Sequence, residues 1–285
     1  MGKRSWLNLV LLFLVVSLAM LVYLEPGKES QQTILLTSLD AEAVQQISVE
    51  RAEDSVVLQK QSGRWLLQTP VVVPAKLLYV QQLLEILSQQ SVQQYPAEGL
   101  DLGKYGLQPP QAKLVVDELE LAFGRINPLN SRLYVMVDNV IHMVAANDIS
   151  LLSEPWHGYV SSALFGAGDK LQSLQLPGLG RLDRSDKGWL FDGAIVPDSA
   201  DQLQAFVDAW THAQALQVRS MSDTVAPENV VVSLVSGAQI SFGLQATEEG
   251  LILQRHELGL EYVFDAVQKK RLLQLPQPAS EVVYE

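Results

Sequence analysis

The hydrophobic pattern of the chain begins with an uncharged run of nineteen residues, from Trp6 to Leu24. Because a helix rises about 1.5 Å per residue, this run would span roughly 28 Å, close to the roughly 30 Å hydrocarbon core of a bilayer. A buried helix of a soluble core would normally show a polar stripe, whereas only Asn8 and Ser17 interrupt this segment. The pattern therefore predicts a transmembrane helix over residues 6–24.

The flanks of this run predict its orientation. Lys3 and Arg4 precede it, and basic residues favour the cytoplasmic side of a membrane. The run ends in Met20 to Leu24, MLVYL, which lacks the small residues of a signal-peptide cleavage site. We therefore expect a retained single-pass anchor in a bacterial inner (cytoplasmic) membrane, with residues 1–5 in the cytoplasm and the body in the periplasm.

Beyond a linker at 25–33, strand-like and helical patterns occur twice in the same order. Each series has an alternating segment, a turn with a Gly-Trp or Gly-x-Trp sequence that enters a strand, and an amphipathic helix. The first series is Ile47 to Leu58, Gly63 to Leu66, and a helix from Pro74 to about Gln90. The second is Leu171 to Leu182, Lys187 to Leu190, and a helix capped by Asp198 or Ser199 that runs to about Ala215.

The two helices share an apolar stripe with i, i+3, i+4, i+7 spacing, offset by 123 residues. The stripes are Val80, Leu83, Leu84 and Leu87 in the first helix and Leu203, Phe206, Val207 and Trp210 in the second. Further pairs follow: Leu121 to Gly124 and Ile240 to Gly243, the hairpins 133–144 and 251–264, and the short helices Ile149 to Leu152 (behind Asn147 and Asp148) and Ala266 to Leu273 (behind Asp265).

These paired patterns predict an α+β fold of two similar antiparallel β-rich units, each with one main amphipathic helix. The expected bounds are 34–160 and 161–273, followed by an extended tail at 274–285. The alternative is that two β-rich units with one helix each resemble one another without duplication. If the units are duplicated, the seam between them is the first place to look for a ligand or a partner.

Composition narrows the class of protein. Hydrophobic residues make up 48% of the chain, so a substantial core can form and disorder is excluded. The formal charge of −12 argues against a nucleic-acid partner, because phosphate would be repelled. The chain contains no cysteine, which excludes disulfides, thiol catalysis and cysteine-ligated metals.

Local signatures of catalysis and of cofactor binding are missing. His142, His157, His212 and His256 form no HxxxH or HExxH pair, so we expect no metal site. No serine stands in a GxSxG elbow, Gly178 to Gly180 lacks the third glycine of a dinucleotide fingerprint, and there is no P-loop. We therefore expect no cofactor and no enzymatic activity.

Two segments carry candidate contact residues for a ligand or a partner. Trp156, His157 and Tyr159 stand between the two units and form a candidate recognition patch, although two aromatic rings there would equally plug the joint between the cores. Arg125 and Arg132 flank a polar irregular stretch and are suited to binding a carboxylate or a phosphate. The alternative for that stretch is ordinary turn chemistry.

The order of several short motifs resembles bacterial membrane-anchored proteins grouped as domain-of-unknown-function family 4340, most clearly over residues 35–165. The motifs are Gly63-x-Trp65, a helix after Pro74, Tyr95-Pro96, Gly99-Leu100, Tyr105-Gly106-Leu107 before Pro109, Phe123-Gly124, Asn127-Pro128 and Tyr134-Val135. The resemblance implies a single-pass anchored envelope protein, and some relatives look like companions of gliding-motility-type ABC export systems. It implies no catalytic residues.

Two functions remain open at this point. The first is a non-enzymatic accessory or scaffold that contacts another envelope protein, with an ABC-type transporter as a candidate. The second is an exported ligand-binding module or hydrolase that acts on a cell-envelope fragment at the seam, through residues such as His157, Tyr159 and Arg132.

Overall fold

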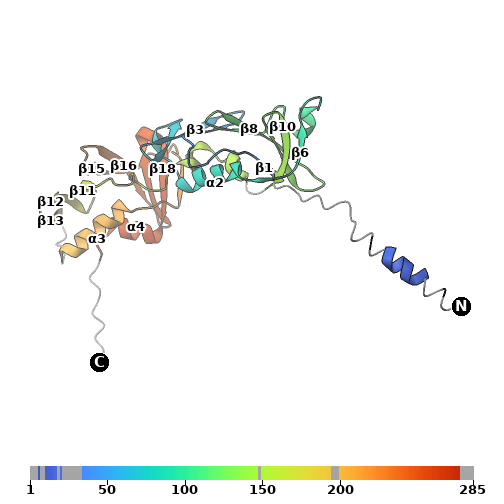
Figure 1. Cartoon of the computed structure of the whole chain (residues 1–285). Helices are drawn as coiled ribbons and strands as arrows, with labels where there is room; N and C mark the ends of the chain where they lie inside the picture. Colours follow the sequence, from blue (N-terminus) through green and yellow to red (C-terminus); the bar gives the residue numbers. More distant parts are fainter. Residues whose placement is uncertain are drawn as a thin grey trace.

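The computed structural model describes residues 6, 10–17, 20, 34–146, 149–193 and 199–276. Residues 7–9, 18–19 and 21–24 of the predicted span, the whole linker at 25–33 and the tail from residue 277 onward lie outside these residues. Within the described parts, no helix combines the length and the apolar character needed to cross a bilayer. The body of the molecule consists of two β-rich units (Figure 1).

The first unit is a ten-stranded antiparallel sheet with one helix, α2 (Leu77–Leu87), packed on it. The strand order is β1-β6-β10-β9-β8-β7-β2-β3-β4-β5. The strands are β1 (Ile34–Leu35), β2 (Gln46–Glu50), β3 (Ser55–Gln61), β4 (Arg64–Thr69), β5 (Val73–Pro74), β6 (Gln90–Pro96), β7 (Ala112–Val116), β8 (Leu119–Ile126), β9 (Arg132–Val137) and β10 (Val140–Ala145). The short 3₁₀ helices η1 (Leu102–Tyr105), η2 (Ser150–Ser153) and η3 (Trp156–Tyr159) lie in the connections.

The second unit is an eight-stranded antiparallel sheet with two helices, α3 (Ala200–Thr211) and α4 (Ala266–Leu273). The strand order is β13-β12-β11-β15-β16-β17-β18-β14. The strands are β11 (Leu171–Leu176), β12 (Gly180–Ser185), β13 (Gly188–Gly193), β14 (Gln217–Ser220), β15 (Glu228–Leu234), β16 (Gln239–Ala246), β17 (Gly250–Arg255) and β18 (Leu260–Asp265). A short 3₁₀ helix, η4 (His256–Leu258), joins the last two strands.

The two sheets have the same topology. Reading the first sheet from β4 gives β4-β3-β2-β7-β8-β9-β10-β6, and each position has its counterpart in β13-β12-β11-β15-β16-β17-β18-β14. In chain order, the main helix follows β4 and the two-residue β5 in the first unit, and it follows β13 in the second. The first unit adds only two two-residue edge strands, β5 and β1. The predicted pair of similar antiparallel units is therefore confirmed.

The alternating segment near the start of each unit is a hairpin rather than a single strand. Ile47 to Leu58 folds back at Arg51 to Asp54, where the Arg51 amide donates to the Asp54 carbonyl and the two side chains form an ion pair. Leu171 to Leu182 folds back where Gly178 adopts a positive φ of 73°. A period of two continues through a tight antiparallel turn, so alternation alone does not show where a strand ends.

The main helices bury the faces predicted for them. Val80, Leu83 and Leu87 are buried on α2, with Leu84 partly buried, and all four stripe residues of α3 are buried. Helix α2 begins after Pro74, because that residue pairs with Leu66 in the sheet. Helix α3 is capped by Ser199, whose Oγ accepts from the Gln202 amide at 3.3 Å. Asp198, the other predicted cap, and Asn147 and Asp148 lie outside the described residues.

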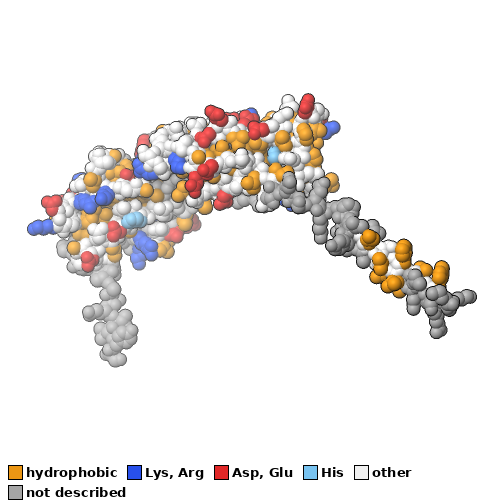
Figure 2. Space-filling model, viewed as in Figure 1, with side chains coloured by type: hydrophobic (Ala, Val, Ile, Leu, Met, Phe, Trp, Pro, Cys, Tyr) orange, Lys and Arg blue, Asp and Glu red, His pale blue; other side chains and the backbone are white. Residues whose placement is uncertain are grey.

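The two units lie end to end and form an elongated body, which the space-filling view also shows (Figures 1 and 2). Strand β1 lies at the end of the first unit away from the second unit (Figure 1). One hydrophobic cluster extends through both units, from Ile47 and Leu83 in the first to Trp210 and Phe264 in the second. The joint between the units is therefore a packed core rather than an open linker.

Candidate functional site at the seam between the two units

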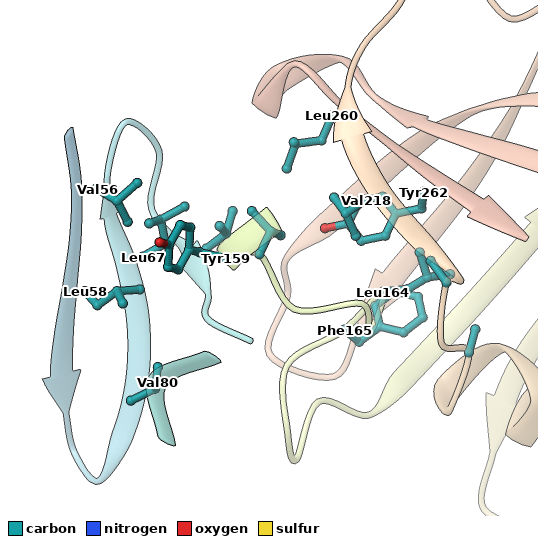
Figure 3. Packing of buried hydrophobic residues seen from close by; sticks show 14 of the residues in the cluster. Val56, Leu58, Leu67, Val80, Tyr159, Leu164, Phe165, Val218, Leu260 and Tyr262 are labelled. Atoms are coloured by element: carbon teal, nitrogen blue, oxygen red, sulfur yellow. The ribbon is translucent and has the colours of Figure 1, made fainter. Parts of the chain in front are cut away.

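Tyr159, at the end of η3, is the central residue of the seam. It is fully buried, and its hydroxyl donates to the Leu151 carbonyl. Its ring packs edge-to-face on Tyr79 of α2, with 5.7 Å between the centroids. Burial raises the pKa of Tyr159 to about 12, so the phenol stays protonated. Figure 3 shows the ring beside Leu67 of β4, so Tyr159 fixes the end of η3 to the first unit.

His157 lies at the edge of the second sheet. Its ring Nδ1 is 3.2 Å from the carbonyl oxygen of Val218 in β14, so the Nδ1–H tautomer would donate to that carbonyl. Trp156 packs edge-to-face beside it at 5.9 Å between centroids. Helix η3 therefore covers the outer edge of β14 in the second unit. Strand β1 has the same position in the first unit, where it pairs with the outer edge of β6.

A small cavity of about 250 Å³ opens beside His157. Lys76 and Tyr79 reach it from α2 and its N-cap, Glu154 and His157 from the connecting segment, and Leu216 from the segment before β14. The Lys76 ammonium lies 4.0 Å from the centre of the Tyr79 ring. The cavity thus combines both signs of charge with an exposed apolar side chain, Leu216.

A second cavity of about 270 Å³ lies elsewhere along the seam, and the sequence provided no sign of it. Its polar groups come from Arg64 on β4, Arg255 on β17, Tyr262 on β18, and Ser161 and Asp169 in the connection. These residues belong to segments far apart in the sequence, and only Arg64 falls in a motif, as the variable residue of Gly63-x-Trp65. Its apolar walls include Leu66, Val72, Val73, Pro74, Ala163, Leu164, Phe165, Ile240 and Leu258.

Arg125 and Arg132 line neither cavity. They flank the β8–β9 hairpin loop, which is ordered by local hydrogen bonds: Asn127 Oδ1 accepts from the Leu129 amide at 2.9 Å, and Asn127 Nδ2 donates to the Tyr134 hydroxyl at 2.8 Å. The structure therefore brings Trp156, His157 and Tyr159 together but does not bring the two arginines to the seam. Their contact with a ligand or partner stays a prediction.

Groups of acidic and histidine side chains that could hold a metal ion are not found among the described residues. The seam offers hydrogen-bond donors, one histidine and both signs of charge, which is a set suited to recognition.

Comparison with known proteins identifies one family. The family model described as Domain of unknown function (DUF4340) matches residues 65–223, which is more than half of the 285-residue chain. The match includes the connection from Trp156 to Asp169 between the two units. No curated protein and no solved structure matches the chain.

Proposed function

The chain belongs to the DUF4340 family of domains of unknown function, and from this premise we propose that it is a single-pass, membrane-anchored, periplasm-facing adaptor that binds another envelope protein at the seam. In this proposal the protein performs no chemical reaction. It serves as an accessory or scaffold of an envelope complex, with an ABC-type transporter as the candidate partner. The anchor is the apolar run over residues 6–24.

The observation that carries the proposal is the end-to-end arrangement of the two units on one continuous core (Figure 1). The described part of the body begins at Ile34, at the end of the first unit away from the second. A bilayer anchor preceding Ile34 would be joined to that end of the body, and the seam would lie on the side of the first unit away from the anchor. Such an arrangement suits the presentation of a surface to a partner.

A photo-crosslinking amino acid at Leu216 tests the seam directly. The Leu216 side chain is 70% exposed and lies beside His157, so substitution there should disturb neither the core nor the hydrogen bond to Val218. Irradiation of intact cells should yield one discrete adduct with a membrane protein. The same probe at Leu129, which is 92% exposed at the tip of the β8–β9 hairpin, serves as the matched control.

An adduct from Leu129 alone would move the partner site to the hairpin of Arg125 and Arg132 and contradict the seam. Recovery of the protein without any adduct, and without a partner in mild detergent, would contradict the adaptor function. A reporter fused to the carboxyl end that is active only in the cytosol would contradict the proposed orientation.

A second candidate function, an exported ligand-binding module or hydrolase acting on an envelope fragment, is favoured by the cavity beside His157. Under this function, a cell-wall fragment should raise the melting temperature of the protein, and His157→Ala should abolish the shift. Absence of a shift with every envelope-derived compound tested would remove the support for this candidate.

A further inference from the structure

The seam cavity of about 270 Å³ combines two guanidinium groups with apolar walls. Arg255 is held in place: its Nε pairs with Glu257, its guanidinium lies 5.4 Å from the centre of the Phe242 ring, and its side chain is only 15% exposed. A guanidinium carries five N–H donors, and this ion pair uses Nε. The terminal nitrogens of Arg255 have no hydrogen-bond partner among the described residues.

Arg64 faces the same cavity from the first unit. Its Nη1 donates to the Ala167 carbonyl at 3.3 Å, and within the described ranges it has no carboxylate at ion-pair distance. This weak contact positions the side chain and leaves most of its donors unused. The two units therefore contribute one cation each to a shared space.

Three further polar side chains line this cavity: Tyr262, Asp169 and Ser161, whose Oγ accepts from the Ala163 amide at 3.2 Å. Tyr262 is buried, and its hydroxyl points toward the first unit (Figure 3). Burial raises the pKa of Tyr262, so the hydroxyl remains a donor. Asp169 supplies the carboxylate on the wall, but its Oδ2 already accepts from the Gly166 amide at 2.8 Å.

The apolar lining residues come from β4, β5 and the turn before it, the connection between the units, β16 and η4. Leu66 and Val73 belong to β4 and β5, Leu164 and Phe165 to the connection, and Ile240 to β16. Arg64 is exposed, whereas these walls shield the Arg255 side chain from water, and this shielding strengthens the attraction between its guanidinium and an anion. A volume of about 270 Å³ is at the small end of ligand pockets, so it admits little more than one apolar side chain with its terminal group.

We propose that this cavity binds the carboxyl terminus of a peptide chain whose last side chain is apolar. The carboxylate is recognised by Arg64, Arg255 and the Tyr262 hydroxyl, because guanidinium groups bind carboxylates through paired hydrogen bonds. The apolar side chain of the last residue of the peptide packs against Leu66, Phe165 and Ile240. The inference deepens the proposed function, since the carboxyl terminus would belong to the partner protein.

Binding of N-acetyl-leucine to the purified full chain in nonionic detergent, followed by ligand-observed NMR, tests the inference. A ligand of this size should bind with a dissociation constant of roughly millimolar. Its carboxamide analogue should bind about tenfold more weakly or not at all, because the charge-assisted hydrogen bonds are lost. Arg64→Gln should weaken binding of the acid about tenfold, and Tyr262→Phe should weaken it severalfold.

Arg184→Gln is the matched control, because Arg184 is an exposed arginine on β12 that lines neither seam cavity. Equal binding of the acid and the amide, or equal behaviour of Arg64→Gln and Arg184→Gln, would overturn the inference. Since this test needs only the purified protein, it can fail while crosslinking from Leu216 still supports the adaptor, and the reverse also holds.

Discussion

Gln254 and Glu261 face one another across the β17–β18 hairpin, and both side chains are fully buried, with Gln254 Nε2 donating to Glu261 Oε1 at 2.9 Å. The equivalent positions of the β9–β10 hairpin in the first unit are occupied by Met136 and Ile141. The same cross-strand position is thus polar in one unit and apolar in the other.

In each unit, the segment that covers this cross-strand pair has the same polarity as the pair. In the first unit, Leu107 from the connection between β6 and β7 packs with Ile141 in a small separate hydrophobic cluster. In the second unit, the connection between β14 and β15 supplies hydrogen bonds instead: Ser222 donates to Glu261 through its amide and its hydroxyl, and the Ala226 amide donates to Gln254 Oε1. Each pair is therefore satisfied by its own covering segment.

Glu261→Gln should destabilise the protein by about 2 kcal/mol, because it removes the charge that accepts from Ser222, Gln254 and Arg219. Because the two units share one core, the whole body should unfold together, and for a body of this size we expect a melting temperature lower by roughly 4–8 °C. Thermal unfolding of the full chain in nonionic detergent, followed by tryptophan fluorescence, measures the change.

The effect of Glu261→Gln should depend on pH in a defined direction. Burial alone would raise the pKa of Glu261, but the hydrogen bonds from Ser222, Gln254 and Arg219 outweigh it and lower the pKa from 4.5 to about 2. A depressed carboxyl pKa stabilises the fold above the unfolded value and ceases to do so as pH falls through the folded value. The difference between wild type and variant should therefore be full above pH 4.5 and shrink toward pH 2. A constant difference over this range would contradict the assignment.

Gly124→Ala should lower stability by about 1–3 kcal/mol, the usual cost of overpacking. A Cβ at Gly124 would lie 2.3 Å from the Tyr105 carbonyl oxygen, so the covering segment of the first unit would have to move. Gly243 is the counterpart on β16, where a Cβ would meet the side chains of Ala226 and His256 at 2.9 Å. Because the overlap at Gly243 is smaller than the overlap with the Tyr105 carbonyl oxygen at Gly124, Gly243→Ala should cost less. A smaller melting-temperature change for Gly124→Ala than for Gly243→Ala would refute this account.

Tyr159→Ala should loosen the joint between the units. Removing this buried ring costs about 3–5 kcal/mol by analogy with other large-to-small core substitutions, and residues 155–169 should become sensitive to limited proteolysis. Tyr159→Phe keeps the ring and removes the hydroxyl interactions with the Leu151 carbonyl and Arg51, so it should cost about 1 kcal/mol without added cleavage. If Tyr159→Ala stays as protease-resistant as wild type, the ring does not hold the seam together.

His142 should make the protein less stable at mildly acidic pH. The side chain is buried on β10, its Nδ1 has no hydrogen-bond partner among the described residues, and burial lowers its pKa below 6.5. A lowered histidine pKa means that the unfolded chain binds the proton first, so stability is full above pH 6.5 and falls as pH decreases below it. His142→Leu should flatten the melting temperature between pH 5 and pH 7, within the range where histidine titrates.

The exposed His212 provides the comparison for this prediction. His212→Gln should leave the acid-side loss of stability in place. An unchanged pH profile in His142→Leu would show that another group is responsible.

Local patterns were sufficient for most elements. The stripe from Leu203 to Trp210 and the cap at Ser199 are encoded within a few neighbouring residues, so periodicity and capping chemistry predicted helix α3. The hairpins 133–144 and 251–264 were predicted for the same reason. The fold-back within Ile47 to Leu58 was missed, because alternation continues through the turn at Arg51 and Asp54.

Part of the candidate site could likewise be predicted from the sequence, and part could not. Proximity in the chain was enough to place Trp156, His157 and Tyr159 between the units, but their burial and hydrogen bonds depend on which strand edge η3 covers. Arg64 and Arg255 line the same cavity because of how the two separately formed sheets pack. No local sequence pattern indicates this arrangement.

The sequence by itself determined the two similar units, their main helices and most hairpins, because these depend on hydrogen bonds and apolar faces between residues close in the chain. Only the tertiary structure decided that the units share one core, that the Tyr159 ring is buried against Tyr79 and that Arg64 and Arg255 line one cavity. The physical reason is that packing between distant segments depends on the shape of whole surfaces, which forms only after each unit has folded.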